Sequence, residues 1–368
     1  MNLSELETPC LVLDRTRLQR NLARMRAVVR RHGVAFRPHL KTAKSAVIGR
    51  LAVEGEFGGI TVSTMAEAEY FAAHGFRDLT LAAGITPRKL ARVTDLVNQG
   101  IEVTVVSDDP DMASVIGNQA TEIRALVEID SGERRGGVDP ESGALLVIAR
   151  ALGSKLAGVL THGGHSYGGR SVLAMKRIAE EERSAAVTAA NRLRGAGLSC
   201  DTVSVGSTPT AIHGERMDGV TEIRAGVYMF QDLFQAEIHS CGREDIALTV
   251  LASVIGRRPG ENRVLLDAGA LALSKDRSTE NTSRDAGFGV VWGLDGRPVF
   301  GECRIEKVYQ EHGIAAGDGP LPFDRLQVGA RVRVAPNHAC LTAAAYDRYH
   351  VVDGGEEIVD VWHRVNGW

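Results

Sequence analysis

Eight short apolar runs, separated by helix-like segments, recur through the first two thirds of the chain. They are rich in β-branched residues and predict strands at Val34–Arg37, Gly59–Ser63, Leu79–Ala83, Ile101–Val106, Arg124–Ile129, Leu156–Leu160, Thr202–Val205 and Glu222–Val227. Amphipathic patterns typical of helices lie between most of them, for example at Thr64–His74, Pro87–Asn98 and Ser171–Arg194. Alternating strands and helices indicate a parallel sheet, and eight repeats are the number that closes a (β/α)8 barrel. The sequence therefore predicts an α/β chain built on a TIM-type barrel.

An open, doubly wound sheet is the alternative architecture. Such a sheet often carries a G-x-G-x-x-G motif after its first strand, and the sequence has none there. The span from about residue 30 to about residue 235 also fits the usual size of a barrel.

From about residue 240 the pattern changes to strands with little helix between them. These strands are expected at Ala247–Ile255, Arg263–Asp267, Arg297–Val308, Arg331–Ala335 and Ile358–Val365, and Thr8–Asp14 can add another. We expect a barrel domain at 15–238 and an all-β domain at 239–368 that includes 1–14. The polar stretch Leu273–Gly289 is a long loop by composition, either on the surface or a lid over a site.

Composition narrows the classes of function. A net charge of −3 over 368 residues implies neither a basic face for nucleic acid nor an acidic tail. No apolar run is long enough to span a membrane, and the first residues lack a secretory signal pattern. The five cysteines are odd in number and scattered, which favours reduced thiols and a cytoplasmic enzyme.

Polar, cationic and glycine residues follow the predicted strands. They are His39 and Lys41 after the first strand, Thr64 after the second, Arg135 after the fifth, His162 and Tyr167 after the sixth, Gly206, Ser207 and Thr208 after the seventh, and Arg224, Gly226 and Val227 at the eighth. Because barrel enzymes work at the carboxyl ends of their strands, we expect these residues to gather on one rim.

Lys41 is the candidate nucleophile of this rim. A lysine that is partly desolvated beside other cations is a good carbonyl nucleophile and can form a Schiff base, although most lysines are surface charges. The glycines and hydroxyls of Gly206–Thr208 and Gly226–Val227 fit a phosphate site, although a plain turn uses the same residues. A lysine and a phosphate site on one rim together point to pyridoxal phosphate.

Three further side chains have candidate roles toward that cofactor. His162 can stack on a flat ring or be a structural histidine. Arg135, like its neighbour Arg134, can neutralise a phenolate or carboxylate or form a surface ion pair. Arg224 can face a pyridine nitrogen or point outward.

The segment Pro336-Asn-His-Ala-Cys340 offers two metal ligands. On a strand, residues two apart share a face, so His338 and Cys340 can bind one metal there, with packing as the alternative. Imidazole and thiolate favour zinc, with manganese or magnesium as further options. Two protein ligands leave open positions for water and substrate.

Four motifs together carry a family resemblance: Thr8-Pro-Cys-Leu-Val-Leu-Asp14, Arg37-Pro-His-Leu-Lys-Thr-Ala-Lys44, Val62-Ser-Thr-Met-Ala-Glu-Ala68 and His338-Ala-Cys340. With them the chain resembles the D-serine dehydratase / D-threonine aldolase family, fold-type III pyridoxal phosphate enzymes related more distantly to alanine racemase. The resemblance covers residues 8 to about 365.

The resemblance implies roles position by position. Lys41 matches the Schiff-base lysine, Arg135 the arginine of an Asp-x-Gly-x-x-Arg motif, and His162 the histidine beside the ring. The matches to the phosphate binders are Gly206, Ser207, Thr208, Gly226 and Val227. His338 and Cys340 match the two metal ligands; the aldolases of the family commonly carry aspartate at the second position, and the eukaryotic-type D-serine dehydratases carry cysteine.

The implied reaction acts on a small D-β-hydroxy amino acid: D-serine, D-threonine or D-threo-3-hydroxyaspartate. Lys41 removes the α-proton, metal on His338 and Cys340 polarises the β-hydroxyl, and a 2-oxo acid and ammonia are released. Lys275 or Arg277 can meet a second substrate carboxylate. Aldol cleavage to glycine and an aldehyde is the alternative.

Three other functions stay open at this point. A racemase needs a second base, for which Tyr346 and Tyr349 are candidates by position. A non-catalytic pyridoxal phosphate carrier does not need the all-β domain. A carbohydrate-active barrel needs paired carboxylates at strand ends, which we do not find. The family resemblance also implies a homodimer.

Overall fold

Eight parallel strands form one sheet in the first part of the computed structural model, which describes residues 1–55 and 59–368. The strands are β2 (Ala35–Phe36), β3 (Ile60–Val62), β4 (Asp78–Gly84), β5 (Glu102–Ser107), β6 (Arg124–Ile129), β7 (Leu156–Thr161), β8 (Thr202–Val205) and β9 (Glu222–Ile223). Their order in the sheet is β2-β9-β8-β7-β6-β5-β4-β3. The two ends meet through a parallel bridge from His39, just after β2, to Thr61 of β3. The sheet is therefore a closed barrel, which confirms the predicted architecture.

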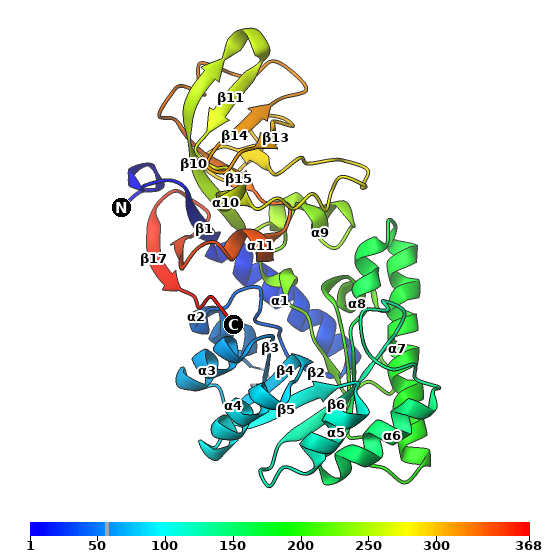
Figure 1. Cartoon of the computed structure of the whole chain (residues 1–368). Coiled ribbons are helices and arrows are strands. Elements are labelled where there is room, and N and C mark those ends of the chain that lie inside the picture. Colours follow the sequence, from blue (N-terminus) through cyan, green and yellow to red (C-terminus); the bar gives the residue numbers. More distant parts are fainter. Residues whose placement is uncertain (56–58) are drawn as a thin grey trace. The chain divides into compact units, whose positions relative to one another are not determined.

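Helices follow the strands along the barrel (Figure 1). They are α2 (Ala46–Val53), α3 (Met65–Ala73), α4 (Pro87–Asn98), α5 (Pro110–Gly117), α6 (Gly143–Leu152), α7 (Val172–Gly195) and α8 (Thr208–His213), with α1 (Arg15–His32) before the first strand. Side-chain caps start several of them, and Thr64, Asp109 and Ser171 each accept a backbone N–H of the first turn. These caps fix where the loops that follow the strands end.

The rest of the chain forms a nine-stranded sheet in the order β11-β14-β13-β12-β15-β10-β1-β16-β17. The strands are β1 (Cys10–Asp14), β10 (Leu248–Arg258), β11 (Arg263–Leu266), β12 (Val290–Trp292), β13 (Arg304–Val308), β14 (Gly313–Ala316), β15 (Arg331–Ala335), β16 (Arg348–Val352) and β17 (Ile358–His363). Because β10 also pairs with β11, six strands close into an antiparallel barrel, and β1, β16 and β17 extend it from β10. Trp292, Leu233 and Ile246 lie in a buried cluster beside this barrel.

Short helices interrupt this second sheet: α9 (Leu233–Glu237), α10 (Ala270–Leu273) and α11 (Ala339–Ala343). The chain divides into two units, one of residues 24–226 and 365–368, the other of residues 1–23 and 227–364. We call them the barrel unit and the β unit. Residues 15–23 and 227–238, which we expected in the barrel domain, are grouped with the β unit.

The sequence patterns located most strands but not their full set. The predicted run Arg297–Val308 forms a strand only in its last part, β13, and Glu222–Val227 only in β9. Strands β12, β14 and β16 carry no clear pattern and were not predicted. The segment Leu273–Gly289 is a loop as expected, and it packs into the β unit through Thr279 and Ala286, both buried.

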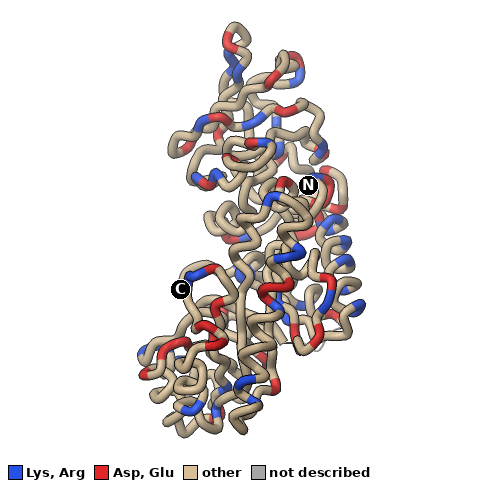
Figure 2. Tube along the Cα trace, turned by 90° about the vertical axis from the view of Figure 1, so that its right-hand side faces the viewer, with Lys and Arg blue, Asp and Glu red and all other residues tan. Residues whose placement is uncertain are grey.

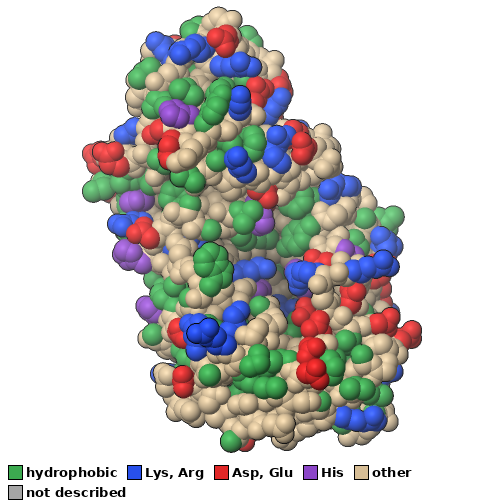
Figure 3. Space-filling view, viewed as in Figure 1, with side chains coloured by type: hydrophobic (Ala, Val, Ile, Leu, Met, Phe, Trp, Pro, Cys, Tyr) green, Lys and Arg blue, Asp and Glu red, His purple; other side chains and the backbone are tan. Residues whose placement is uncertain are grey.

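Charges of both signs are mixed over each unit. Basic and acidic residues are interspersed along the tube in both units (Figure 2). The face of the molecule drawn in Figure 3 also carries side chains of both charges. Among the described residues, no helix is both long and apolar enough to cross a membrane.

Candidate active site

Lys41 lies in a turn directly after β2, on the rim where the parallel strands end, and its side chain is exposed. Its backbone nitrogen is 3.5 Å from Nδ1 of His39, and Nε2 of His39 is 3.4 Å from Oγ of Ser63. Burial first, and then the charge of Lys41, lower the pKa of His39 well below its usual value. His39 is therefore a neutral imidazole next to the candidate nucleophile.

The turn that carries Lys41 is held at both ends. Leu40 N–H donates to Thr61 O at 2.9 Å, and Lys44 N–H donates to Leu40 O at 2.7 Å. Lys44 has a φ of +48°, and its Nζ lies 3.1 Å from the carboxylate of Glu67, which is buried. This buried ion pair anchors the backbone three residues after Lys41.

His162 follows β7 on the same rim. Its Nδ1 lies 2.7 Å from the carbonyl oxygen of Gly206, an acceptor, so Nδ1 carries the hydrogen. Burial first, and then the charge of Lys41, lower the pKa of His162 to about 3. The ring is thus neutral and fixed in one tautomer, as a group that lies against a cofactor ring can be.

Arg224 is buried inside the barrel, so it does not point outward. Its guanidinium donates to Oγ of Ser204 and, at 2.6 Å, to the carbonyl oxygen of Thr161. Ser204 in turn donates to Glu222, whose other oxygen accepts from Nε of Arg37 at 2.9 Å. The arginine is therefore held rigidly by the strands β7 and β8.

The predicted phosphate binders are brought together, although two amides are already engaged within the protein. Gly206 N–H donates to Glu182 Oε1 at 2.8 Å, and Ser207 N–H donates to Thr210 Oγ1 at 3.0 Å. Oγ of Ser207 also lies 3.0 Å from Oγ of Ser166. Oγ of Ser207 also accepts Thr210 N–H at 3.2 Å, so this hydroxyl is engaged within the protein as well.

Gly226 packs closely against the turn that carries Lys41. A Cβ there would lie 2.9 Å from the carbonyl oxygen of His39 and 3.1 Å from Oγ1 of Thr42. No side chain can be placed there without a shift. Val227, the next residue, begins the β unit.

Other predicted residues of the rim have local roles. The Arg135 side chain is 57 % exposed and lies 3.6 Å from Glu133 and 3.8 Å from Glu128. Thr64 caps α3 by accepting Glu67 N–H at 3.1 Å. Tyr167 lies in the short helix after β7 and is partly buried.

His338 and Cys340 lie together in the β unit, but not on a strand as expected. Strand β15 ends at Ala335, His338 is the cap residue of α11, and Cys340 is in the first turn of that helix. The helix begins here because Asp232 Oδ2 accepts Ala339 N–H at 3.0 Å. The prediction of a shared strand face is therefore wrong, and a helix cap brings the two side chains together instead.

A carboxylate that the sequence did not reveal, Asp276, completes this cluster. Its Oδ2 is 3.5 Å from Nδ1 of His338. Burial disfavours the charged imidazole, yet hydrogen bonds with Asp276 and Cys340 raise the pKa of His338 to about 11. Within residues 1–55 and 59–368, no three His, Cys, Asp or Glu side chains are arranged as a complete metal cage. The nitrogen and sulfur donors of His338 and Cys340 nevertheless fit an open site with two protein ligands.

The two tyrosines considered for a racemase are engaged elsewhere in the β unit. Tyr346 donates to Ala272 O at 3.0 Å, and burial raises its pKa above its usual value. Tyr349 is fully buried and accepts from Nε of Arg364 at 2.9 Å. Neither is placed as an exposed second base.

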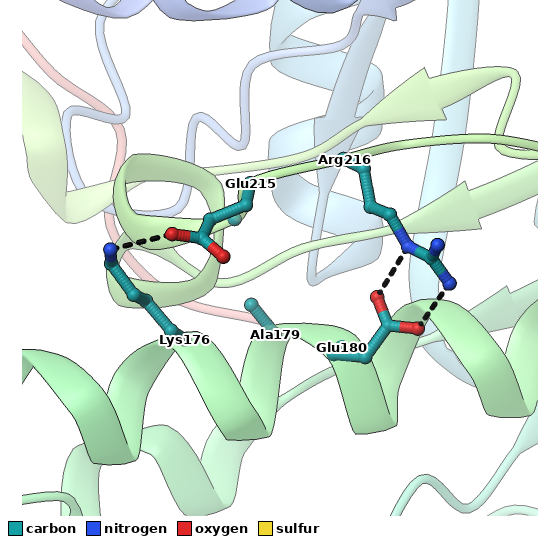
Figure 4. Close-up of a pocket in the computed structure, with 6 residues that line it drawn as sticks. Lys176, Ala179, Glu180, Glu215 and Arg216 are labelled. Atoms are coloured by element: carbon teal, nitrogen blue, oxygen red, sulfur yellow. Dashed lines mark hydrogen bonds and ion pairs between the residues drawn. The ribbon is translucent and has the colours of Figure 1, made fainter.

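A surface pocket of the barrel unit lies apart from these residues. It has a volume of about 290 Å³ and is lined by α7 and the loop after α8, where ion pairs join Lys176 to Glu215 and Arg216 to Glu180 (Figure 4). None of the predicted site residues lines it.

Glu182, which the sequence patterns did not single out, holds two loops of the barrel rim. It lies on the buried face of α7, 1 % exposed, and Oε1 accepts Gly163 N–H at 2.5 Å and Gly206 N–H at 2.8 Å. Its only signal in the sequence is an acid within the apolar stripe of a helix.

Two family models match the chain. The alanine racemase N-terminal domain matches residues 13–233, and the putative serine dehydratase domain matches residues 247–352. The D-threo-3-hydroxyaspartate dehydratase of Delftia sp. strain HT23 is 41 % identical over 99 % of this chain and 98 % of its own length. The D-serine dehydratase of Dictyostelium discoideum is 29 % identical over 100 % and 98 %, and a 3-hydroxy-D-aspartate aldolase of Paracoccus denitrificans is 30 % identical over 98 % and 92 %.

Solved structures agree with these matches. The structure of the Delftia dehydratase superimposes with a TM-score of 0.95 at 40 % identity and covers 100 % of both chains. A further solved structure, also with a TM-score of 0.95 at 40 % identity, is of a D-threo-3-hydroxyaspartate dehydratase with a cysteine-to-alanine mutation in the metal-free form. The motifs, the closed barrel with Lys41 on its rim, and these full-length matches lead to one conclusion: the chain belongs to the D-serine dehydratase / D-threonine aldolase family of alanine-racemase-like enzymes.

Proposed function

We propose that the chain is a pyridoxal phosphate- and divalent metal-dependent lyase that dehydrates a D-β-hydroxy amino acid to a 2-oxo acid and ammonia. Its proposed substrate is D-threo-3-hydroxyaspartate, with D-serine and D-threonine as the other members of the class. The contact between His338 and Cys340 carries the choice of dehydration, because nitrogen and sulfur donors suit a metal that assists a leaving hydroxyl. Full-length similarity to a dehydratase that is named for this substrate supports the choice.

The residues of the barrel rim fit pyridoxal phosphate. The cofactor, when bound, supplies the electron sink for charge at the α-carbon. Lys41 is the proposed attachment point and the base that takes the α-proton. The neutral His162 is proposed to lie against the ring, Arg224 to face its nitrogen, and the hydroxyls of Ser207 and Thr208 to bind the phosphate together with Gly226 and Val227. For His39, Thr64, Arg135, Tyr167 and Gly206 the proposal is a supporting contact.

The metal is proposed to bind His338 and Cys340, with zinc favoured over manganese and magnesium. A metal there would supply Lewis-acid assistance at the β-hydroxyl. A D-threo-3-hydroxyaspartate dehydratase whose structure was solved as a cysteine-to-alanine mutant in the metal-free form is consistent with this proposal.

Lys275 is proposed to meet the second carboxylate of the substrate. Of the two cations considered, Arg277 is engaged with Asp285 at 2.7 Å and stacks on Phe288. Lys275 is exposed and directly precedes Asp276, which contacts the proposed metal ligand His338. Recognition of a second carboxylate by Lys275 would favour hydroxyaspartate over D-serine.

A homodimer in the cytoplasm is the proposed form of the enzyme. Three large apolar side chains on neighbouring segments of the β unit, Leu271, Tyr309 and Leu341, are about half exposed. Leu271 N–H donates to Gln310 O, and α10 contacts α11, so the segments that carry these side chains are neighbours, and we propose that they contribute to the interface. The mixed surface charge and the small-molecule chemistry of the site support a function that involves neither nucleic acid nor membrane.

Product analysis tests the proposal. The purified holoenzyme is incubated with D-threo-3-hydroxyaspartate, D-serine and D-threonine, with and without a chelator. Dehydration of hydroxyaspartate gives oxaloacetate and ammonia, whereas aldol cleavage gives glycine and glyoxylate. Oxaloacetate that disappears on chelation supports the proposal, and glycine as the main product would establish the aldolase reaction instead.

The variant Lys41→Ala tests the proposed role of Lys41. We expect it to lose the visible absorbance of lysine-bound cofactor and to lower turnover by about 10²–10⁴-fold. Retention of both the absorbance and the activity would overturn the assignment of Lys41.

A further inference from the structure

We infer that Asp276 is a positioning residue that orients the imidazole of His338 toward the metal, and that the loop 274–289 serves to hold it. The inference rests on the proposed metal role of His338 and deepens it. The carboxylate of Asp276 lies 3.5 Å from Nδ1 of His338, and we therefore assign Nε2 as the nitrogen for the metal. Asp276 itself remains outside the set of ligands.

The two oxygens of Asp276 are used for different contacts. Oδ2 faces Nδ1 of His338 at 3.5 Å. Oδ1 accepts the backbone N–H of Ser278 at 2.9 Å and also the Ser278 hydroxyl. Because Oδ1 is held by two donors of its own loop, Oδ2 has one orientation, toward the histidine.

The backbone of Asp276 is fastened directly to the segment of His338. Asn337, the residue before His338, donates from Nδ2 to Asp276 O at 3.1 Å. The Asn337 Oδ1 accepts from Thr279 Oγ1 at 2.8 Å, and both side chains are buried. The loop and the metal-binding segment therefore form one hydrogen-bonded unit, which is a physical reason for the length of this loop.

A strained residue sets the direction in which the loop leaves α10. Ser274 has a φ of +69°, in the left-handed region that a non-glycine residue rarely adopts. Its Oγ accepts Asp276 N–H at 3.2 Å. Such strain persists where the surrounding contacts compensate for it, and here it turns the chain so that Asp276 faces His338.

The second nearby carboxylate, Asp232, has a separate task. Its oxygens accept the backbone N–H groups of Gln235 at 2.8 Å and Ala339 at 3.0 Å. Asp232 therefore fixes the start of α11, and Asp276 is left to fix the ring of His338.

A carboxylate on the far nitrogen of a metal-bound histidine selects the tautomer and raises the basicity of the ligand. Loss of such a partner typically weakens metal binding by about 10–100-fold. The variant Asp276→Asn is informative because of how its amide would be oriented. The N–H and the hydroxyl of Ser278 would bind the carbonyl oxygen of the new asparagine, and its NH2 group would then face Nδ1 of His338. The amide then donates to Nδ1 and places the hydrogen of the imidazole on Nε2, where it blocks the metal.

The experiment measures zinc affinity by competition with a chromophoric chelator, using the holoenzyme form of the wild type, Asp276→Ala and Asp276→Asn. Glu280→Gln is the control, since it removes one negative charge from the same loop at an exposed position. We expect about 10–100-fold weaker zinc binding for both Asp276 variants and less than about 3-fold change for the control. In the cobalt-substituted Asp276→Ala protein, a thiolate-to-cobalt absorption band should persist.

The outcomes separate the inference from the proposed function. If the wild type binds zinc and Asp276→Ala binds it equally well, the positioning role is wrong while the metal site stands. If the wild type binds no zinc, both fail. A crystal structure of the zinc form that shows Nδ1 of His338 or the carboxylate of Asp276 on the metal would also overturn the inference.

Discussion

At the scale of single residues, the ring of His162 has a property that can be measured directly. Its pKa of about 3 in the folded protein lies below the usual 6.5, because burial and then the charge of Lys41 oppose protonation, as do Arg135 and Arg224. In the unfolded chain His162 becomes protonated below about pH 6.5, whereas in the folded chain it stays neutral down to about pH 3. The free energy of unfolding therefore decreases as the pH falls from about 6.5 toward about 3.

We therefore expect the NMR signals of the His162 ring to show a neutral imidazole with its hydrogen on Nδ1 throughout pH 5–8. The variant His162→Asn should show a flatter pH dependence of the free energy of unfolding between about pH 4 and about pH 6.5. A ring that is charged at pH 6 would contradict this environment.

Substrate choice also belongs to the residue scale. Replacing Lys275 with methionine removes the cation that is proposed to meet the second carboxylate, and a charged hydrogen bond is worth about 1.5–3 kcal/mol. We expect KM for D-threo-3-hydroxyaspartate to rise by about 10–100-fold, with KM for D-serine unchanged. Equal changes for both substrates would show that Lys275 does not read the second carboxylate.

Single residues differ in how far sequence alone could place them. Lys41 and His162 were predictable because each follows a strand, and strand ends share one rim. Asp276 and Glu182 were not, since one lies in an irregular loop and the other in the middle of the long helix α7. The contacts by which Asp276 and Glu182 act are hydrogen bonds to residues that are distant in the chain, and such contacts leave no periodic pattern in a sequence.

At the scale of elements, α7 organises two rim loops through one carboxylate. Glu182→Ala would leave Gly163 N–H and Gly206 N–H buried without their acceptor, at a cost of about 2–5 kcal/mol for the pair. We expect a lower free energy of unfolding in urea and weaker cofactor binding, because His162 is bonded to Gly206.

Glu181→Gln, on the neighbouring and partly exposed position of α7, serves as the control. It should change stability by no more than about 1 kcal/mol. Equal effects of the two substitutions would show that the loops do not depend on Glu182.

The elements also show why some strands and one site geometry were mispredicted. Strands β12 and β14 have three and four residues, too few to display alternation. The segment of His338 and Cys340 looked like the end of a strand, but Asp232 captures Ala339 N–H and starts a helix. The carboxylate of Asp232, which is distant in the chain, therefore determines that this segment forms a helix rather than a strand.

At the scale of the whole molecule, the order of the eight barrel strands and the change to an all-β region were readable from the sequence. Periodicity and repeat number fix these features, whereas the division at residues 23 and 226 depends on packing. The association state is likewise a property of surfaces that one sequence does not reveal.

The proposed homodimer gives a prediction at this scale. Leu271→Asp places a charge at an exposed apolar position of the proposed interface, to which Tyr309 and Leu341 are also assigned. We expect light scattering to show monomers for the variant and dimers for the parent protein, whereas Arg263→Asp, an exposed change on β11, should leave the dimer intact. A variant that stays dimeric would exclude this surface as the interface.

The closure of the eight-stranded sheet has one more consequence. β2 and β3 are joined by a single bridge at His39 and Thr61, and Lys41 stands two residues beyond it. Local opening is expected most readily where few hydrogen bonds hold a barrel together, and we predict that a cofactor attached at Lys41, as proposed, would stabilise this junction. Loading with cofactor should then slow amide hydrogen exchange most at residues 37–41 and 60–62, so that cofactor binding would stabilise the closed barrel as well as supply the chemistry.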